Sequence, residues 1–173
     1  ADTDKLQFFF ADAQANGITF LPPDINTGLV RFTPVDGQTI RYGLGAIKGT
    51  GESALSVIIA ARQTAPFADL FDFCRRIDRR VVNRRVIEAL IRAGAFDSLD
   101  AQRAKLLASV SRALEAAEQA ERNAHQGGLF DLPDSAPTVE THYVDVPVWS
   151  ERERLLNEKQ ALGFFLSGHP FTA

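Results

Sequence analysis

The chain of 173 residues contains no methionine, one cysteine, one tryptophan and two tyrosines. Because Cys74 has no second cysteine to pair with, an internal disulfide is excluded, and the composition fits a reducing cytosol. The neighbours Phe71, Phe73 and Ile77 favour a packed thiol over a nucleophile. The absence of methionine, including at position 1, indicates a piece cut from a longer protein.

The chain also lacks an apolar run of membrane-spanning length and a signal-peptide pattern, so we expect no membrane partner and a cytoplasmic location. The net charge of −3 means that the chain as a whole is not a basic nucleic-acid-binding protein, and any such contact must come from a local patch. The carboxylates of Asp24, Asp69 and Asp72 do not have a metal-binding spacing. A free-standing nuclease or glycosylase is therefore disfavoured, and no cofactor is expected in this segment.

Residues 42–62, YGLGAIKGTGESALSVIIAAR, place a short glycine turn between an apolar segment and a helical run. Gly49 and Gly51 allow the backbone to come close to a ligand, and the helix that follows directs its unpaired N–H groups to the same side. Lys48 adds a positive charge. The turn Lys48, Gly49, Thr50, Gly51 is therefore predicted to hold a nucleic-acid phosphate. An ordinary helical corner closed by glycines accounts for the same spacing equally well.

The remaining pattern predicts a mainly α fold with a small β-hairpin, a tandem helix-hairpin-helix domain, and an extended C-terminal linker and helix. Two strands are expected over 29–32 and 39–42, joined by a turn at Asp36-Gly37. Helices are expected over 3–15, 67–77, 84–92 with Asn83 as cap, 100–123 with Asp100 as cap, and 150–160 with a capping box of Ser150 and Glu153.

A second helix–turn–helix unit follows the first by about 45 residues, but its turn, residues 93–99, lacks the second glycine. Between the two turns, seven arginines within 18 residues face two acids, a local balance of +5, and Arg103 and Lys105 extend the run. Such a run is usually a solvated face. Beside a phosphate-binding turn it favours contact with a duplex backbone, which should weaken steeply with salt. The predicted contacts are Arg79, Arg80, Arg84 and Arg85.

A short motif, Gln126-Gly127-Gly128-Leu129-Phe130, lies within a loop rich in Gly, Pro, Asp and Ala. Two large apolar residues gain nothing in a flexible polar loop, whereas in a partner's pocket each could contribute roughly 1.5–3 kcal/mol. The amide of Gln126 could hold the register at the pocket rim. The pattern favours a partner-binding motif over a pair that folds back onto the chain's own core.

Several blocks, in the right order and over nearly the whole chain, resemble the C family of bacterial replicative DNA polymerases, the DNA polymerase III alpha subunits. The blocks are LPPDIN at 21–26, the run around YGLGAIKGTGE at 40–52, FADLFDFC at 67–74, residues 83–97 and GFFLSGHP at 163–170. The resemblance implies four regions. They are the end of the fingers with the β-hairpin (1–42), a tandem helix-hairpin-helix domain that contacts duplex DNA (43–123), a clamp-binding loop (124–137), and an extended segment and helix leading to an oligonucleotide-binding fold (138–173).

The resemblance also implies partners and roles. Gln126, Leu129 and Phe130 are similar to the family's motif for the sliding clamp (the beta subunit), although two glycines stand where the family has a larger and a polar residue, which adds backbone entropy to be lost on docking. Other replisome subunits are expected partners through the parent protein. The parent is a DNA-directed nucleotidyltransferase that uses Mg²⁺, but its catalytic aspartates lie upstream, so no catalytic residue is placed in this segment.

A second interpretation stays open at the level of the sequence. The acidic net charge and the degenerate second turn also fit an interaction scaffold of the replisome whose hairpins are structural and do not bind DNA. Reversing the charge of Lys48 and Arg84 to glutamate distinguishes the two hypotheses, because only the first predicts a loss of duplex affinity.

Overall fold

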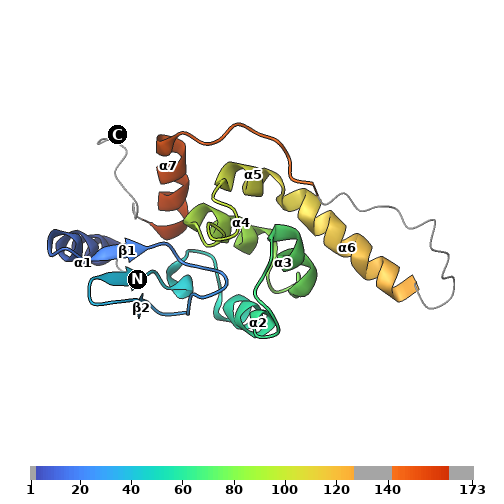
Figure 1. Cartoon of the computed structure of the whole chain (residues 1–173), viewed down its shortest axis with the longest axis horizontal. Helices are drawn as coiled ribbons and strands as arrows, with labels where there is room; N and C mark the ends of the chain where they lie inside the picture. The colour runs from blue at the N-terminus through green and yellow to red at the C-terminus, as the bar shows by residue number, and fades with distance from the viewer. Residues whose placement is uncertain (1–2, 127–141, 164–173) are drawn as a thin grey trace.

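The computed structural model describes residues 3–126 and 142–163 (Figure 1). Its helices are α1 (Thr3–Ala15), α2 (Glu52–Arg62), α3 (Leu70–Arg76), α4 (Arg84–Ala93), α5 (Arg103–Ala108), α6 (Val110–Gln126) and α7 (Glu151–Leu162). Within these ranges, β1 (Thr19–Leu21), β2 (Thr33–Pro34) and β3 (Thr39–Arg41) form one small sheet, and η1 (Leu44–Ala46) is a single 3-10 turn. The predicted fold class is confirmed.

The sheet has the strand order β1-β3-β2, with β3 antiparallel to β2 and parallel to β1. The predicted turn at Asp36-Gly37 is present: Val35 N–H donates to the carbonyl of Thr39 at 2.8 Å, and the Asp36 carboxylate accepts from Gln38 N–H at 2.8 Å. The strand β1 was not predicted. It is three residues long and pairs in parallel with a strand far along the chain, so its local pattern carries no signal of the pairing.

The predicted strand over 29–32 is wrong, because the strand that precedes the turn is β2. The carbonyls of Leu29 and Val30 accept hydrogen bonds from the amides of Leu44 and Gly45, each at 2.9 Å. This stretch is therefore held by η1 rather than by β3.

The core extends from the sheet and α1 into the helical body, where α6 packs along α3 and α7 packs along α4 (Figure 1). The ring of Phe73 packs edge-on against Phe67 and Phe96, with centroid distances of 4.8 and 5.0 Å, and all three side chains are buried. The far end of α6 projects away from this body (Figure 1). No helix among the described residues has both the length and the apolar character needed to cross a bilayer.

Two predicted helix caps are confirmed. The side chain of Asn83 accepts from the amide of Val86 at 3.1 Å and begins α4. Ser150 and Glu153 form the predicted capping box at the start of α7. Both caps satisfy backbone N–H groups that have no partner inside the helix, which is why the local sequence sufficed to place these ends.

The single helix predicted over 100–123 is wrong, because the chain breaks it into α5 and α6. Asp100 does not cap α5; its carboxylate accepts from the amide of Gln102 at 2.9 Å, in the turn before the helix. At the break, the buried hydroxyl of Ser109 accepts from the amide of Val144 at 2.8 Å. The returning segment at residues 142–144 thus docks where the two helices meet.

The LPPDIN block ties the sheet to the helical body. One carboxylate oxygen of Asp24 accepts from the amides of Asn26 and Thr27 at 2.8 and 3.0 Å, which folds the block into a turn. The side-chain amide of Asn26 then makes two hydrogen bonds with the backbone of Phe67, at 2.7 and 3.1 Å. These bonds hold the LPPDIN block against the segment that precedes α3.

Candidate nucleic-acid interface

The first glycine turn lies between η1 and α2. Gly49 has φ +84°, a left-handed backbone conformation that L-residues with a side chain rarely adopt. The hydroxyl of Thr50 donates to the carbonyl of Ile47 at 2.8 Å and closes the turn from within. Lys48 and Gly49 are exposed at its outer side. The side chain of Lys48 forms no ion pair with any described residue.

The helix that follows this turn starts without a side-chain cap, because its N-cap residue is Gly51. The helix α5 likewise has no side-chain cap, whereas side chains cap α3, α4 and α7. Among the described residues, the amides of Glu52, Ser53 and Ala54 have no acceptor; Glu52 and Ser53 are exposed, whereas Ala54 is buried, so two exposed donors and the positive end of the helix dipole lie at the surface. This arrangement can accept an anion.

The two glycines of this turn leave open space beside the backbone. A Cβ built on Gly49 would meet no atom within 4 Å, and one built on Gly51 would meet only the Ser53 hydroxyl, at 3.9 Å. Gly51 has φ −74° and ψ 160°, which any residue can adopt. Neither the backbone conformation nor the packing of Gly51 requires a glycine, whereas the close approach of an outside ligand would.

The second turn, between α4 and α5, has a similar backbone but a filled interior. Gly94 has φ +88° and ends α4. A Cβ built on Gly94 would collide with the guanidinium of Arg103, which is 4% exposed. The amides of Gly94, Ala95 and Asp97 all donate to carbonyls of the same unit. This turn therefore offers little to a phosphate.

Arg103 is held inside the second turn by two carboxylates. Its Nε and Nη2 donate to Asp97 at 2.9 and 2.7 Å, and its Nη1 donates to Glu158 of α7 at 3.2 Å. Burial opposes the charge of Arg103, but hydrogen bonding and attraction to the two carboxylates outweigh it, so its pKa is raised. The side chain that extended the basic run in the sequence is thus a buried structural group.

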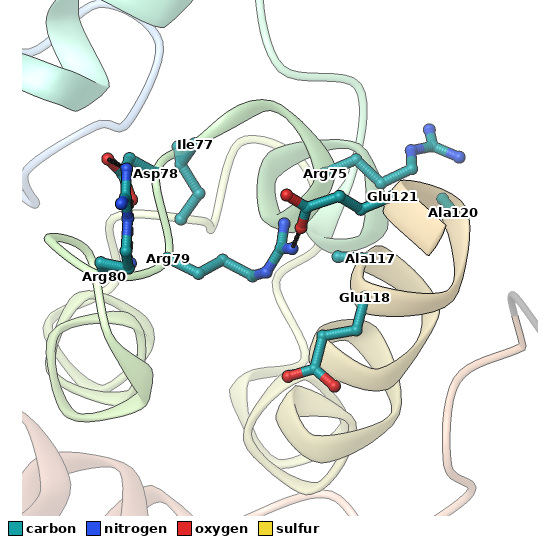
Figure 2. A pocket seen from close by; sticks show the side chains of 9 residues that line it. All are labelled: Arg75, Ile77, Asp78, Arg79, Arg80, Ala117, Glu118, Ala120 and Glu121. Atoms are coloured by element: carbon teal, nitrogen blue, oxygen red, sulfur yellow. Dashed lines mark hydrogen bonds and ion pairs between the residues drawn. The ribbon is translucent and has the colours of Figure 1, made fainter. Parts of the chain in front are cut away.

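The predicted contacts Arg79 and Arg80 both form ion pairs within the chain. Arg79 pairs with Glu121 of α6, and Arg80 pairs with Asp78 at 3.1 Å. Figure 2 shows Arg79 reaching across a groove of about 890 Å³ toward α6, with Arg75 and Arg80 at its two ends. The groove lining is balanced in charge, with three arginines and three acids: Arg75, Arg79, Arg80, Asp78, Glu118 and Glu121.

The other two predicted arginines lie in the first turn of α4. Arg84 donates to Glu88 at 3.2 Å and to the hydroxyl of Ser111. Arg85 is exposed and forms no ion pair with any described residue. The local excess of +5 counted in the sequence is reduced because Asp72 and Glu121, outside the counted window, pair with arginines inside it.

A family model described as the helix-hairpin-helix motif matches residues 17–106, which include both turns. The chain belongs to the helix-hairpin-helix family. It is also 53% identical over 171 residues to the DNA polymerase III subunit alpha of Neisseria meningitidis serogroup B, 47% over 174 residues to that of Vibrio cholerae, and 42% over 173 residues to that of Escherichia coli K12. Each match covers 98% of this chain and 15% of the relative. The helix-hairpin-helix chain is therefore a homologue of one segment of the DNA polymerase III alpha subunits.

The predicted clamp motif of this helix-hairpin-helix chain lies almost wholly outside the described residues. Gln126 is the last residue of α6, and Leu129 and Phe130 fall beyond it. The helix thus runs up to the first residue of the motif. The motif assignment stays a prediction.

Two further groups have structural roles. Arg76 donates to the carbonyls of Ala61 and Ala65 at 2.8 and 2.6 Å, at the end of α2. Burial raises the pKa of the Cys74 thiol to about 12, in keeping with the predicted packed thiol. Among the described residues, no group of three or more His, Cys, Asp or Glu side chains is arranged to hold a metal ion.

Sequence reasoning missed the pairing of Arg103 with Glu158. The two residues are 55 positions apart, so no local spacing connects them. One signal was available: Glu158 stands on the same helical face as Leu155 and Leu162, both buried, and an acid on an apolar face needs a cationic partner.

Proposed function

We propose that this chain holds duplex DNA by its phosphate backbone within a replicative DNA polymerase in the cytoplasm. The observation that carries the proposal is the open first turn, where the uncapped start of α2 lies beside Lys48 and two glycines border open space. The similarity of the chain to DNA polymerase III alpha subunits supports the choice of DNA as the source of the phosphate. Nucleotidyl transfer and its Mg²⁺ would belong to the parent polymerase, outside this segment.

The turn would bind one phosphate through several hydrogen-bond donors, each of which contributes little by itself. The amides at the start of α2 point at the anion, Lys48 adds a full charge, and Gly51 lets the phosphate oxygens reach the backbone. None of these groups reads a base edge, so the binding would be independent of sequence. Arg85 is the arginine best placed to add a phosphate contact; Arg79, Arg80 and Arg84 would first have to leave their acidic partners.

A duplex titration tests the proposal. We expect Lys48→Gln to weaken the affinity roughly three- to tenfold and to reduce the slope of log affinity against log salt by about one. The double variant Lys48→Glu/Arg84→Glu should weaken it further. The matched control is Arg152→Gln, which removes one exposed charge from α7. Equal affinities for all four proteins would contradict the proposal and leave the scaffold interpretation.

We further propose that the Gln126–Phe130 motif tethers the polymerase to the sliding clamp. The support is the motif itself and its place at the end of α6. Near that end, Glu121 of α6 pairs with Arg79 of the helical body. Leu129→Ala/Phe130→Ala should abolish clamp binding in a calorimetric titration and leave duplex affinity unchanged. Leu132→Ala, an apolar residue of the same loop outside the motif, is the control. Clamp affinity that survives the double change would refute the motif.

A further inference from the structure

The first turn is tied to α7 by a backbone hydrogen bond. The amide of Lys48 donates to the carbonyl of Ala161 at 2.7 Å. The nearby Thr50 bonds to the carbonyls of Ile47 and Leu44, so the hydrogen bond of Lys48 is the one that links the turn to the C-terminal helix. The residue that carries the positive charge of the turn is therefore also the residue that α7 holds.

One helical turn earlier, α7 is tied to the second hairpin. Glu158 is fully buried and accepts from Arg103, whose remaining donors go to Asp97 and to the carbonyl of Arg92. The side chain of Arg92 donates in addition to Asn157 at 3.2 Å. The helix α7 thus contacts both hairpins, through groups on one face.

These contacts fix the register of α7. A buried carboxylate without its cation is strongly unfavourable, so Glu158 has to stay opposite Arg103. Because Ala161 lies three residues later on the same helix, its carbonyl is then held opposite the amide of Lys48. A slip of α7 along its axis would break both contacts together.

We propose that α7 is the positioning element of the first turn, and that Glu158, acting through Arg103, is the positioning residue that sets how Lys48 meets a phosphate. The second hairpin, filled by Arg103, then serves as the fixed base against which α7 holds the open one. This inference rests on the proposed duplex-holding function of the first turn.

Glu158→Gln keeps the shape of the side chain and removes its charge; Glu151→Gln removes the same charge from an exposed position of the same helix. On electrostatic grounds alone both should bind duplex equally or slightly more tightly. We expect instead that Glu158→Gln binds roughly three- to tenfold more weakly at a temperature where both are folded, and that Glu151→Gln does not. Equal affinities for the two variants would overturn the inference.

Two further measurements distinguish a positioning role of Glu158 from a general destabilisation of the fold. In the double variant Lys48→Gln/Glu158→Gln, the second change should add little to the loss caused by the first, because both act on the same contact. Additive losses would contradict the inference. In the unaltered chain, hydrogen exchange should show the Lys48 amide protected and the amides of Glu52 and Ser53, which are exposed and lack an acceptor among the described residues, exchanging fast. Fast exchange at Lys48 would also overturn it, whether or not Glu158→Gln folds.

The outcomes distinguish this inference from the function on which it rests. If Lys48→Gln leaves duplex affinity unchanged, the duplex-holding function fails, and protection of the Lys48 amide then reports only the contact with α7. If Lys48→Gln weakens binding and Glu158→Gln does not, the function stands and the positioning role of α7 is refuted.

Discussion

The two hairpins of this chain have nearly the same backbone at their glycines and opposite surroundings. Gly49 has φ +84° and borders open space, whereas Gly94 has φ +88° and lies against the buried guanidinium of Arg103. The helices that follow the two turns, α2 and the six-residue α5, both start without a side-chain cap, but the second turn uses its own amides internally. The first hairpin therefore differs in having open space beside its backbone and the exposed Lys48, which a phosphate could use.

The comparison shows that a repeated motif does not imply a repeated function. In the second hairpin, Asp97 and Glu158 supply the negative charge around Arg103, so the protein itself occupies the place that an anion would take. The result is a rigid unit against which α7 can pack. Under the proposed function, the first hairpin would bind the phosphate and the second would support it.

The largest expected effect is a loss of stability, caused by adding a methyl group at the glycine of the second hairpin. In Gly94→Ala the new Cβ would displace the buried Arg103 from its two carboxylate partners and strain a left-handed backbone, so we expect a loss of about 3 kcal/mol or more in the free energy of unfolding. Gly49→Ala has the same backbone strain without the collision and should cost about 1–2 kcal/mol. Urea unfolding followed by circular dichroism measures both values. Equal losses would mean that the packing around the two glycines does not differ.

The local sequence predicted the features that depend on neighbouring residues. The cap of α4 by Asn83, the capping box of α7 and the glycine turn before α2 were all correct, because each is set by groups within about four positions. The helix break and the ion-pair partners that the local sequence did not predict depend on distant residues. The break at Ser109 depends on Val144, and the Arg79 pair depends on Glu121.

The same reasoning explains the partial success at the candidate interface. The turn of Lys48 and its glycines could be found because spacing alone determines a turn. The arginine run was overestimated because a count along the sequence includes only the acids nearby, whereas folding brings Asp72 and Glu121 against it. Charge on a surface is a property of the packed helices, so it could not be summed from one window.

A smaller effect, on binding rather than on stability, is expected for Gly51→Ala. Its backbone conformation and surroundings accept a Cβ, so the free energy of unfolding should change by no more than about 1 kcal/mol. The methyl group would stand where the phosphate approaches, and we expect duplex affinity to fall roughly fivefold. The control is Gly37→Ala, in the β2–β3 turn, where a Cβ meets no atom within 4 Å. If the two variants bind duplex alike, the open space at Gly51 is not a phosphate site.

The smallest effect tests whether the start of α2 carries the binding. Glu52 lies in the first turn of α2, where its charge favours the helix dipole but repels a phosphate at the same amides. Glu52→Gln should therefore raise duplex affinity about twofold, more at low salt than at high salt, and lower the stability of the fold by a few tenths of a kcal/mol. Glu115→Gln removes the same charge from an exposed position on α6 and should have a weaker effect on binding. Equal gains for both would mean that the duplex senses only the net charge of the chain, and the contrast between an open and a filled hairpin would then have no bearing on DNA.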